Sequence, residues 1–176
     1  NGRLKNLYKM TSPPDVTKFP PPRYDKFNKS KYGFWRPVQA TRGCPFPCTF
    51  CSISEFFQRS YRKRPVDQVV RDVRAAKKSG TKFITFIDDN IGVDFKYCQQ
   101  LWEALIPEKI IWASQCSIQI AQNDDMLALA AKSGCRILSF GIETVNEKSL
   151  EHIDKEWNRP QHYTSAINNI RKHGIE

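Results

Sequence analysis

The chain has 176 residues, of which 28 are Lys or Arg and 18 are Asp or Glu, so its formal charge is +10. This length is enough for one domain with a hydrophobic core and too short for two large ones. The sequence contains neither a run of about 18 to 20 apolar residues, as a membrane span needs, nor an apolar signal-peptide core near its start. A chain of this size folds without disulfides, so its six cysteines favour a reducing compartment, and we expect a cytoplasmic protein.

The positive charge is concentrated in the first half of the chain. Residues 1–42 carry ten Lys or Arg and two Asp or Glu, whereas residues 81–176 carry ten and thirteen. An excess confined to one half does not indicate a surface that coats nucleic acid. It is compatible with solvated lysines, an RNA substrate, an anionic small molecule or an acidic protein partner.

Residues 1–33 contain two proline clusters and no apolar period, which predicts a basic linker or arm ahead of a domain over residues 34–176. The chain begins with Asn1 and stops after Gly174-Ile175-Glu176, where a new apolar segment would begin. We therefore expect it to be part of a longer protein.

Strands and helices are predicted to alternate along the domain. A first strand over residues 35–41 precedes a Cys-rich loop, and a helix runs from Pro65 to Gly80 before a second strand over residues 83–87. Further helices are predicted to start after Asp94, after Asn123 and at Pro160, and further strands to cover residues 110–113 and 137–142.

Four strands that alternate with helices imply an α/β fold with a parallel sheet and right-handed crossovers. Four strands cannot close a barrel, because an eight-stranded barrel takes about 250 residues. An open sheet edge is therefore expected.

Three cysteines, Cys44, Cys48 and Cys51, follow directly after the first predicted strand. Active sites of α/β folds lie at this end of a strand. Pro45 and Pro47 prevent a regular helix, so the loop can turn its three thiols toward one centre.

Thiolates select zinc or iron-sulfur clusters. A structural zinc site normally has a fourth local Cys or His, but the three histidines lie far along the chain, at His152, His162 and His173. A four-iron cluster with three protein ligands leaves one iron open to substrate. The other cysteines, Cys98, Cys116 and Cys135, are expected to be small buried hydrophobic residues.

The Cys-x3-Cys-x2-Cys spacing, with Phe50 before the last cysteine, resembles the signature of the radical S-adenosylmethionine (SAM) enzymes. The resemblance implies a partial TIM-type (β/α) barrel, of which this chain supplies only the first four β/α units. It also implies a 4Fe-4S cluster on the three cysteines that cleaves SAM reductively to methionine and a 5′-deoxyadenosyl radical. Structural zinc or an unrelated cluster is the alternative.

The same resemblance suggests which residues contact SAM. Phe50 lies near the adenine, and Asp88-Asp89-Asn90 stand where the family has a Gly-Gly-Glu that holds the amino group. Carboxylate and amide oxygens can accept from an ammonium, although this tripeptide can also be a turn. Glu143 would face the ribose or amino group, and Ser117 is preferred over Gln115 and Gln119 as a further polar partner. No catalytic residue for the substrate can be named.

The match extends over roughly residues 20–176 and includes the segments Val38 to Pro45, Tyr61 to Pro65 and Gly141 to Glu143. They are arranged as in cobalamin-binding radical SAM proteins, which implies a methylation or related radical transformation of a small molecule, with cobalamin bound by the full-length protein. The alternatives are an enzyme similar to the tRNA methylthiotransferases, with RNA as partner, and a non-catalytic zinc-binding interaction module.

A group of basic residues follows the cysteine loop, namely Arg59, Arg62, Lys63 and Arg64. They are interpreted either as solvated side chains or as a docking site for an acidic electron donor such as flavodoxin or ferredoxin.

Overall fold

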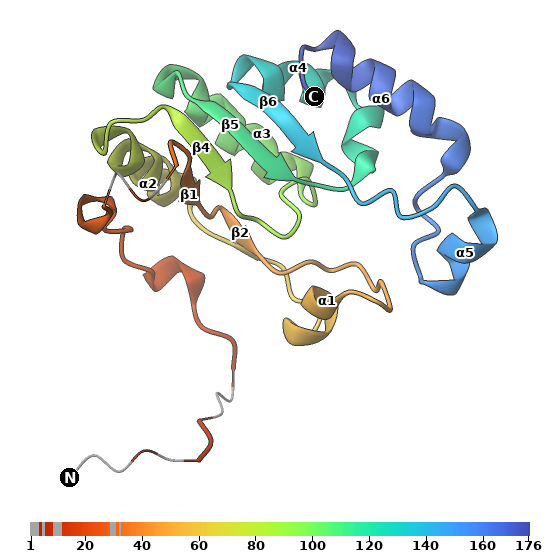
Figure 1. Ribbon diagram of the computed structural model, residues 1–176, viewed down its shortest axis with the longest axis horizontal. Helices are drawn as coiled ribbons and strands as arrows, with labels where there is room; N and C mark the ends of the chain where they lie inside the picture. The colour runs from red at the N-terminus through yellow and green to blue at the C-terminus, as the bar shows by residue number, and fades with distance from the viewer. Residues whose placement is uncertain (1–3, 5, 9–11, 29–30, 32) are drawn as a thin grey trace.

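A parallel sheet of four strands forms the centre of the computed structural model, which describes residues 4, 6–8, 12–28, 31 and 33–176 (Figure 1). Its strands are β1 (Arg36–Val38), β4 (Phe83–Phe86), β5 (Ile111–Gln115) and β6 (Cys135–Ser139), and they neighbour one another in that order. Every adjacent pair is parallel. The predicted α/β class and open partial barrel are therefore confirmed.

Four longer helices connect and flank the strands: α2 (Val66–Lys78), α3 (Phe95–Leu105), α4 (Asp124–Lys132) and α6 (Tyr163–Lys172). Two of the predicted caps are present, because Asp94 accepts from Tyr97 N at 3.0 Å and Asn123 accepts from Met126 N at 3.0 Å. Among the described residues, no helix has the length and hydrophobicity to cross a bilayer.

The two faces of the sheet have different surroundings. On one face, side chains such as Ile84, Phe86 and Trp112 are buried in the hydrophobic core together with those of α2, α3 and α4. On the other face, Thr85 and Ala113 line a cavity. Because side chains alternate along a strand, one strand serves both the core and the cavity.

Two predicted strands end earlier than expected, and side-chain hydrogen bonds explain both differences. The strand predicted over residues 35–41 is divided into β1 and β2 (Thr41–Arg42), and β2 pairs antiparallel with β3 (Arg62–Lys63). The chain leaves the sheet here because Ala40 N and Thr41 N donate to the Asp88 carboxylate and not to a neighbouring strand.

The strand predicted over residues 137–142 is β6, which begins at Cys135 and ends at Ser139. Beyond it, Asn158 Nδ2 donates to Gly141 O at 2.8 Å, and Glu143 has φ +64°, which is not a strand conformation. Two short helices, α1 (Ser52–Phe56) and α5 (Glu147–His152), were not predicted.

The described part of the N-terminal arm packs against the domain. Val16 and Tyr24 are buried, and the Tyr24 hydroxyl donates to Pro37 O at 2.5 Å. Gln68 in α2 donates to Thr17 O at 2.9 Å. Several positions of the predicted arm, residues 1–3, 5, 9–11, 29–30 and 32, lie outside the described residues.

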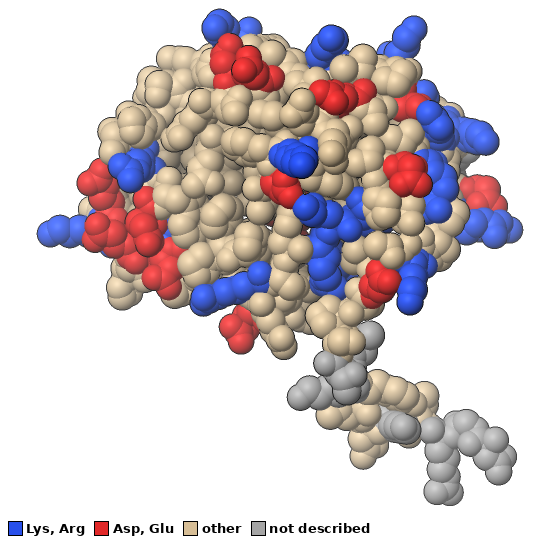
Figure 2. Space-filling model, turned by 180° about the vertical axis from the view of Figure 1, so that it is seen from behind, with Lys and Arg blue, Asp and Glu red and all other residues tan. Residues whose placement is uncertain are grey.

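Charge is unevenly distributed over the surface. Figure 2 shows Lys and Arg side chains gathered on the part of one face nearer the arm, with some Asp and Glu among them, and a group of Asp and Glu side chains on the other side of that face.

Candidate functional site

A cavity of about 620 Å³ lies at the carboxyl ends of β4, β5 and β6 and beside the cysteine loop. All nine residues that the sequence suggested for the cluster and for SAM line this cavity: Cys44, Cys48, Phe50, Cys51, Asp88, Asp89, Asn90, Ser117 and Glu143. Gln115 also lines it, whereas Gln119 does not. Residues separated by up to a hundred positions therefore meet at one place, as expected for the carboxyl edge of a parallel sheet.

The cysteine loop is fixed at its start by a glycine. Gly43 has φ +87°, and a Cβ atom at this position would lie 2.1 Å from Ser60 O, so a side chain would collide with the backbone. Gly43 N donates to Asp89 Oδ2 at 2.7 Å, which ties the loop to the end of β4.

The three loop cysteines are free and half-buried. Burial raises the pKa of the Cys44 and Cys48 thiols, and the Lys155 charge acts in the opposite direction on Cys48. Asn90 Nδ2 lies 3.8 Å from Cys44 Sγ and can donate to it. Burial thus disfavours the thiolate forms of the free thiols, and a bound metal would stabilise them.

The three loop cysteines supply donors that suit an iron-sulfur cluster. Among the described residues, no group of three or more His, Cys, Asp or Glu side chains is placed to hold one metal ion. A tetrahedral zinc site needs its ligands around one point. In a 4Fe-4S cluster each thiolate binds a different iron, so three free thiols along one wide cavity are a suitable donor set.

Asp88 is used mainly within the chain. Its carboxylate is almost fully buried and accepts from Ala40 N, from Thr41 N and from Thr41 Oγ1, the last at 2.6 Å. Burial raises its pKa to about 6, although these hydrogen bonds favour the ionised form. Asp88 therefore braces the approach to the cysteine loop.

Asn90 and Ser117 bind each other across the ends of β4 and β5. Ser117 N donates to Asn90 Oδ1 at 3.0 Å, and Asn90 Nδ2 lies 3.3 Å from Ser117 Oγ. Asp89 is half-buried, and among the described residues no hydrogen bond reaches its Oδ1 oxygen. Of the tripeptide, Asp89 thus has the most capacity left for a ligand.

Lys155 lines the same cavity and was not among the residues predicted for the site. Lys155 Nζ lies 2.7 Å from Glu143 Oε1 and 5.7 Å from the centre of the Phe50 ring. Its side chain is only 12% exposed. A single lysine in a polar stretch carries no pattern that would distinguish it from surface lysines.

Residues 153–158 pack against the cysteine loop. The Trp157 ring is stacked on Phe46, with centroids 4.5 Å apart and planes inclined by 22°. Thr49 N donates to Ile153 O at 3.2 Å. Trp157 was also missed, although a tryptophan within an otherwise polar segment is a signal of burial.

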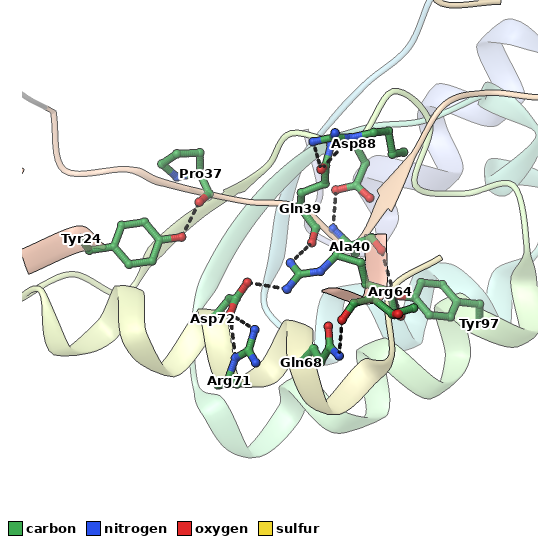
Figure 3. A network of polar contacts seen from close by, with 12 residues as sticks. Tyr24, Pro37, Gln39, Ala40, Arg64, Gln68, Arg71, Asp72, Asp88 and Tyr97 are labelled. Atoms are coloured by element: carbon green, nitrogen blue, oxygen red, sulfur yellow. Dashed lines mark hydrogen bonds and ion pairs between the residues drawn. The ribbon is translucent and has the colours of Figure 1, made fainter. Parts of the chain in front are cut away.

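Of the four basic residues after the cysteine loop, Arg64 fits neither the solvated nor the docking interpretation, because it is buried. Arg64 is 4% exposed, and its guanidinium binds Asp72 Oδ2 at 2.8 Å and Gln39 O at 2.8 Å (Figure 3). Arg62 is half-buried and lies over the Phe57 ring. The remaining two are exposed, and Lys63 pairs with Asp94 at 2.5 Å.

Solved structures with a similar fold are radical SAM enzymes. The radical SAM methyltransferase TsrM from Kitasatospora setae, with tryptophan and a SAM analogue bound, matches with a TM-score of 0.73 and 15% identity over 81% of this chain and 29% of its own. The cobalamin-dependent SAM radical enzyme OxsB, with aqua-cobalamin and SAM bound, matches with a TM-score of 0.68 and 20% identity over 80% of this chain and 22% of its own. These identities support a shared fold.

Sequence comparison identifies the family. The bacteriochlorophyllide d C-12(1)-methyltransferase of Chlorobaculum tepidum is 32% identical over 99% of this chain, and the chain spans 40% of that protein's length. The hopanoid C-2 methylase of Rhodopseudomonas palustris is 26% identical over 92% of this chain and 32% of its own length. The family model of the Radical SAM superfamily matches residues 38–176. The chain therefore belongs to the radical SAM superfamily.

Proposed function

We propose that this chain is the radical SAM domain of a cobalamin-dependent methyltransferase. The observation that carries the proposal is that three free cysteines line one cavity together with acidic side chains at the carboxyl ends of the strands. The two relatives described above are named as a methyltransferase and a methylase, and both are longer than this chain. Their names refer to a bacteriochlorophyllide and a hopanoid, so the shared feature is methyl transfer to a small molecule and not one substrate.

Cys44, Cys48 and Cys51 are the residues that would hold the 4Fe-4S cluster. When bound, this cluster supplies the electron that cleaves SAM to methionine and a 5′-deoxyadenosyl radical. Asp89 and Glu143 offer carboxylate oxygens that can accept from the SAM ammonium or from ribose hydroxyls. Phe50, whose ring is 55% exposed, offers a flat apolar surface for the adenine.

Three further cavity residues mainly position their neighbours by hydrogen bonds, namely Asp88, Asn90 and Ser117. Asp88 fixes Ala40 and Thr41 ahead of the loop, and Asn90 holds Ser117 while it faces Cys44. Ile87 and Ile137 give the sheet side of the cavity an apolar lining. A lining of this kind helps to exclude water from a reactive intermediate.

We propose that the full-length protein also binds cobalamin, accepts electrons from an acidic carrier and lies in the cytoplasm. The solved structure of OxsB contains aqua-cobalamin, and cobalamin in the full-length protein would carry the methyl group. An acidic flavodoxin or ferredoxin fits the positive charge of the chain as electron donor. The six cysteines are all free, which supports the cytoplasm as the compartment.

The test is anaerobic reconstitution with iron and sulfide, followed by metal analysis and measurement of 5′-deoxyadenosine formed from SAM under dithionite. We expect about four irons and four sulfides per chain. The triple variant Cys44→Ala/Cys48→Ala/Cys51→Ala is expected to lose the iron and the product. The matched control is Cys135→Ala, which removes a buried thiol from β6 and is expected to retain the iron.

The outcomes separate the alternatives. Stoichiometric zinc that persists during iron reconstitution, with SAM unchanged, would contradict the enzyme and support a zinc-binding interaction module. Iron retained by the triple variant would show that these cysteines are not the cluster ligands. RNA binding that weakens steeply with salt would favour the tRNA methylthiotransferase alternative, because each neutralised phosphate releases counterions.

A further inference from the structure

Lys155 contributes a positive charge to a cavity that is otherwise acidic. Among the described residues that line the cavity, it is the single Lys or Arg, beside the carboxylates of Asp88, Asp89 and Glu143. Neither the cysteine signature nor the proposed SAM contacts gives this lysine a role.

The position of Lys155 Nζ is fixed from two sides. It lies 2.7 Å from Glu143 Oε1 and 5.7 Å from the centre of the Phe50 ring. Phe50 is the residue directly before Cys51 in the sequence. Gly141 makes room for both side chains, because a Cβ atom there would lie 2.7 Å from Lys155 Nζ and 2.4 Å from Glu143 Oε1. The ammonium is thus held beside the cysteine loop and not in bulk water.

Burial makes this charge effective at a distance. The Lys155 side chain is 12% exposed and that of Glu143 is 34% exposed. Coulomb interactions are several times stronger in such an environment than in water, where a surface lysine is screened.

We propose that Lys155 is a positioning residue whose charge, moderated by Glu143, raises the reduction potential of the cluster held by the three loop cysteines. The inference rests on the proposed function. Reduction adds one electron, taken from dithionite or a protein donor, to the cluster and so adds one negative charge to the cavity. The three carboxylates oppose this added charge, and the ammonium of Lys155 favours it. Glu143 partly neutralises Lys155, so removal of the Glu143 charge should make reduction easier.

The test is a redox titration of the reconstituted chain without SAM, followed by electron paramagnetic resonance of the reduced cluster. Lys155→Met is expected to lower the equilibrium constant for reduction about tenfold, which is about 59 mV toward negative potential for one electron. Glu143→Gln is expected to shift the potential in the positive direction, and Lys155→Arg to keep the wild-type value. The control is Lys148→Met, which removes an exposed lysine from α5.

Iron content is measured on every variant, so a loss of cluster is separated from a change in potential. Opposite shifts in Lys155→Met and Glu143→Gln, at full iron content, support the inference. Potentials equal to wild type in both variants would overturn it and leave Lys155 with a packing role. Shifts of the same sign in both variants would overturn it as well. A wild-type chain that binds no iron would overturn the proposed function, and this inference would fall with it.

Discussion

At the scale of single residues, Asp88 joins two segments through one carboxylate. It accepts from the backbone of Ala40 and Thr41 while it stands at the end of β4. Its burial raises its pKa from 3.8 to about 6. The folded protein therefore binds a proton at Asp88 between about pH 4 and pH 6, whereas the unfolded chain has released it.

This difference predicts a pH dependence of stability. Because the folded state binds more protons in that window, the contribution of Asp88 to the free energy of unfolding falls as the pH rises from about 4 to about 6. The loss amounts to about 3 kcal/mol and is constant above that window. The Asp88→Asn variant should lack this pH-dependent loss. Urea unfolding of both proteins at several pH values will measure the difference in their free energies of unfolding. Parallel pH profiles for the two proteins would contradict the assignment.

The sequence was sufficient to predict which residues line the cavity but not which of them are free to bind a ligand. The cysteine spacing and the strand ends placed Cys44, Asp89 and Glu143 at one edge of the sheet. Which oxygens remain available depends on hydrogen bonds across the fold, such as those that occupy Asp88, and these leave no trace in a local pattern. Lys155 was missed for the same reason.

At the scale of elements, the cysteine loop is held by a segment that follows α5. Trp157 stacks on Phe46, and Thr49 N donates to Ile153 O. Since loops without regular hydrogen bonds are among the least stable parts of a fold, these contacts add to the rigidity that Gly43 gives the start of the loop.

Trp157→Ala is therefore expected to loosen the loop more than the rest of the domain. The stacked aromatic pair contributes about 0.5–1.5 kcal/mol beyond its buried area. We expect amide hydrogen exchange over residues 44–51 to become about tenfold faster, with exchange in β5 unchanged. Phe56→Ala, which truncates a 77% exposed ring in α1, is the control. Uniformly faster exchange throughout the chain would instead indicate global destabilisation.

The longer helices were predicted well, whereas the short helices and the strand ends were not, for physical reasons. Helices α2, α3 and α4 were predicted because a repeated apolar face and clear end signals coincide. The short helices α1 and α5 carry less than two turns of pattern. The ends of β1 and β6 depend on Asp88 and Asn158, which bind from elsewhere in the fold.

At the scale of the whole molecule, Arg64 connects several parts of the structure (Figure 3). Its guanidinium binds Asp72 in α2 and the carbonyl of Gln39, and Tyr97 in α3 donates to Arg64 O at 2.8 Å. Arg64 N donates to Ala40 O at 2.9 Å. The network thus anchors the start of the cysteine loop to two helices.

Arg64→Met should destabilise the whole domain, because it leaves the Asp72 carboxylate buried with Arg71 as its remaining ion-pair partner. Loss of one partner of a buried pair costs about 3–5 kcal/mol, and Arg71 should keep the effect near the lower limit. Urea unfolding will measure it. Arg59→Met, at an exposed position, should stay within about 0.5 kcal/mol of wild type. Equal stability of the two variants would contradict the role of the network.

The dependence of the loop on Ile153 and Trp157 also sets an order of events during biosynthesis. The ribosome adds about 5–20 residues per second, so the roughly hundred residues between Cys51 and Trp157 take about 5–20 s to appear. During that interval the three thiols are present in a segment that lacks its later contacts. The loop therefore acquires its full set of contacts only after this region has been translated, and we expect cluster assembly to follow that step.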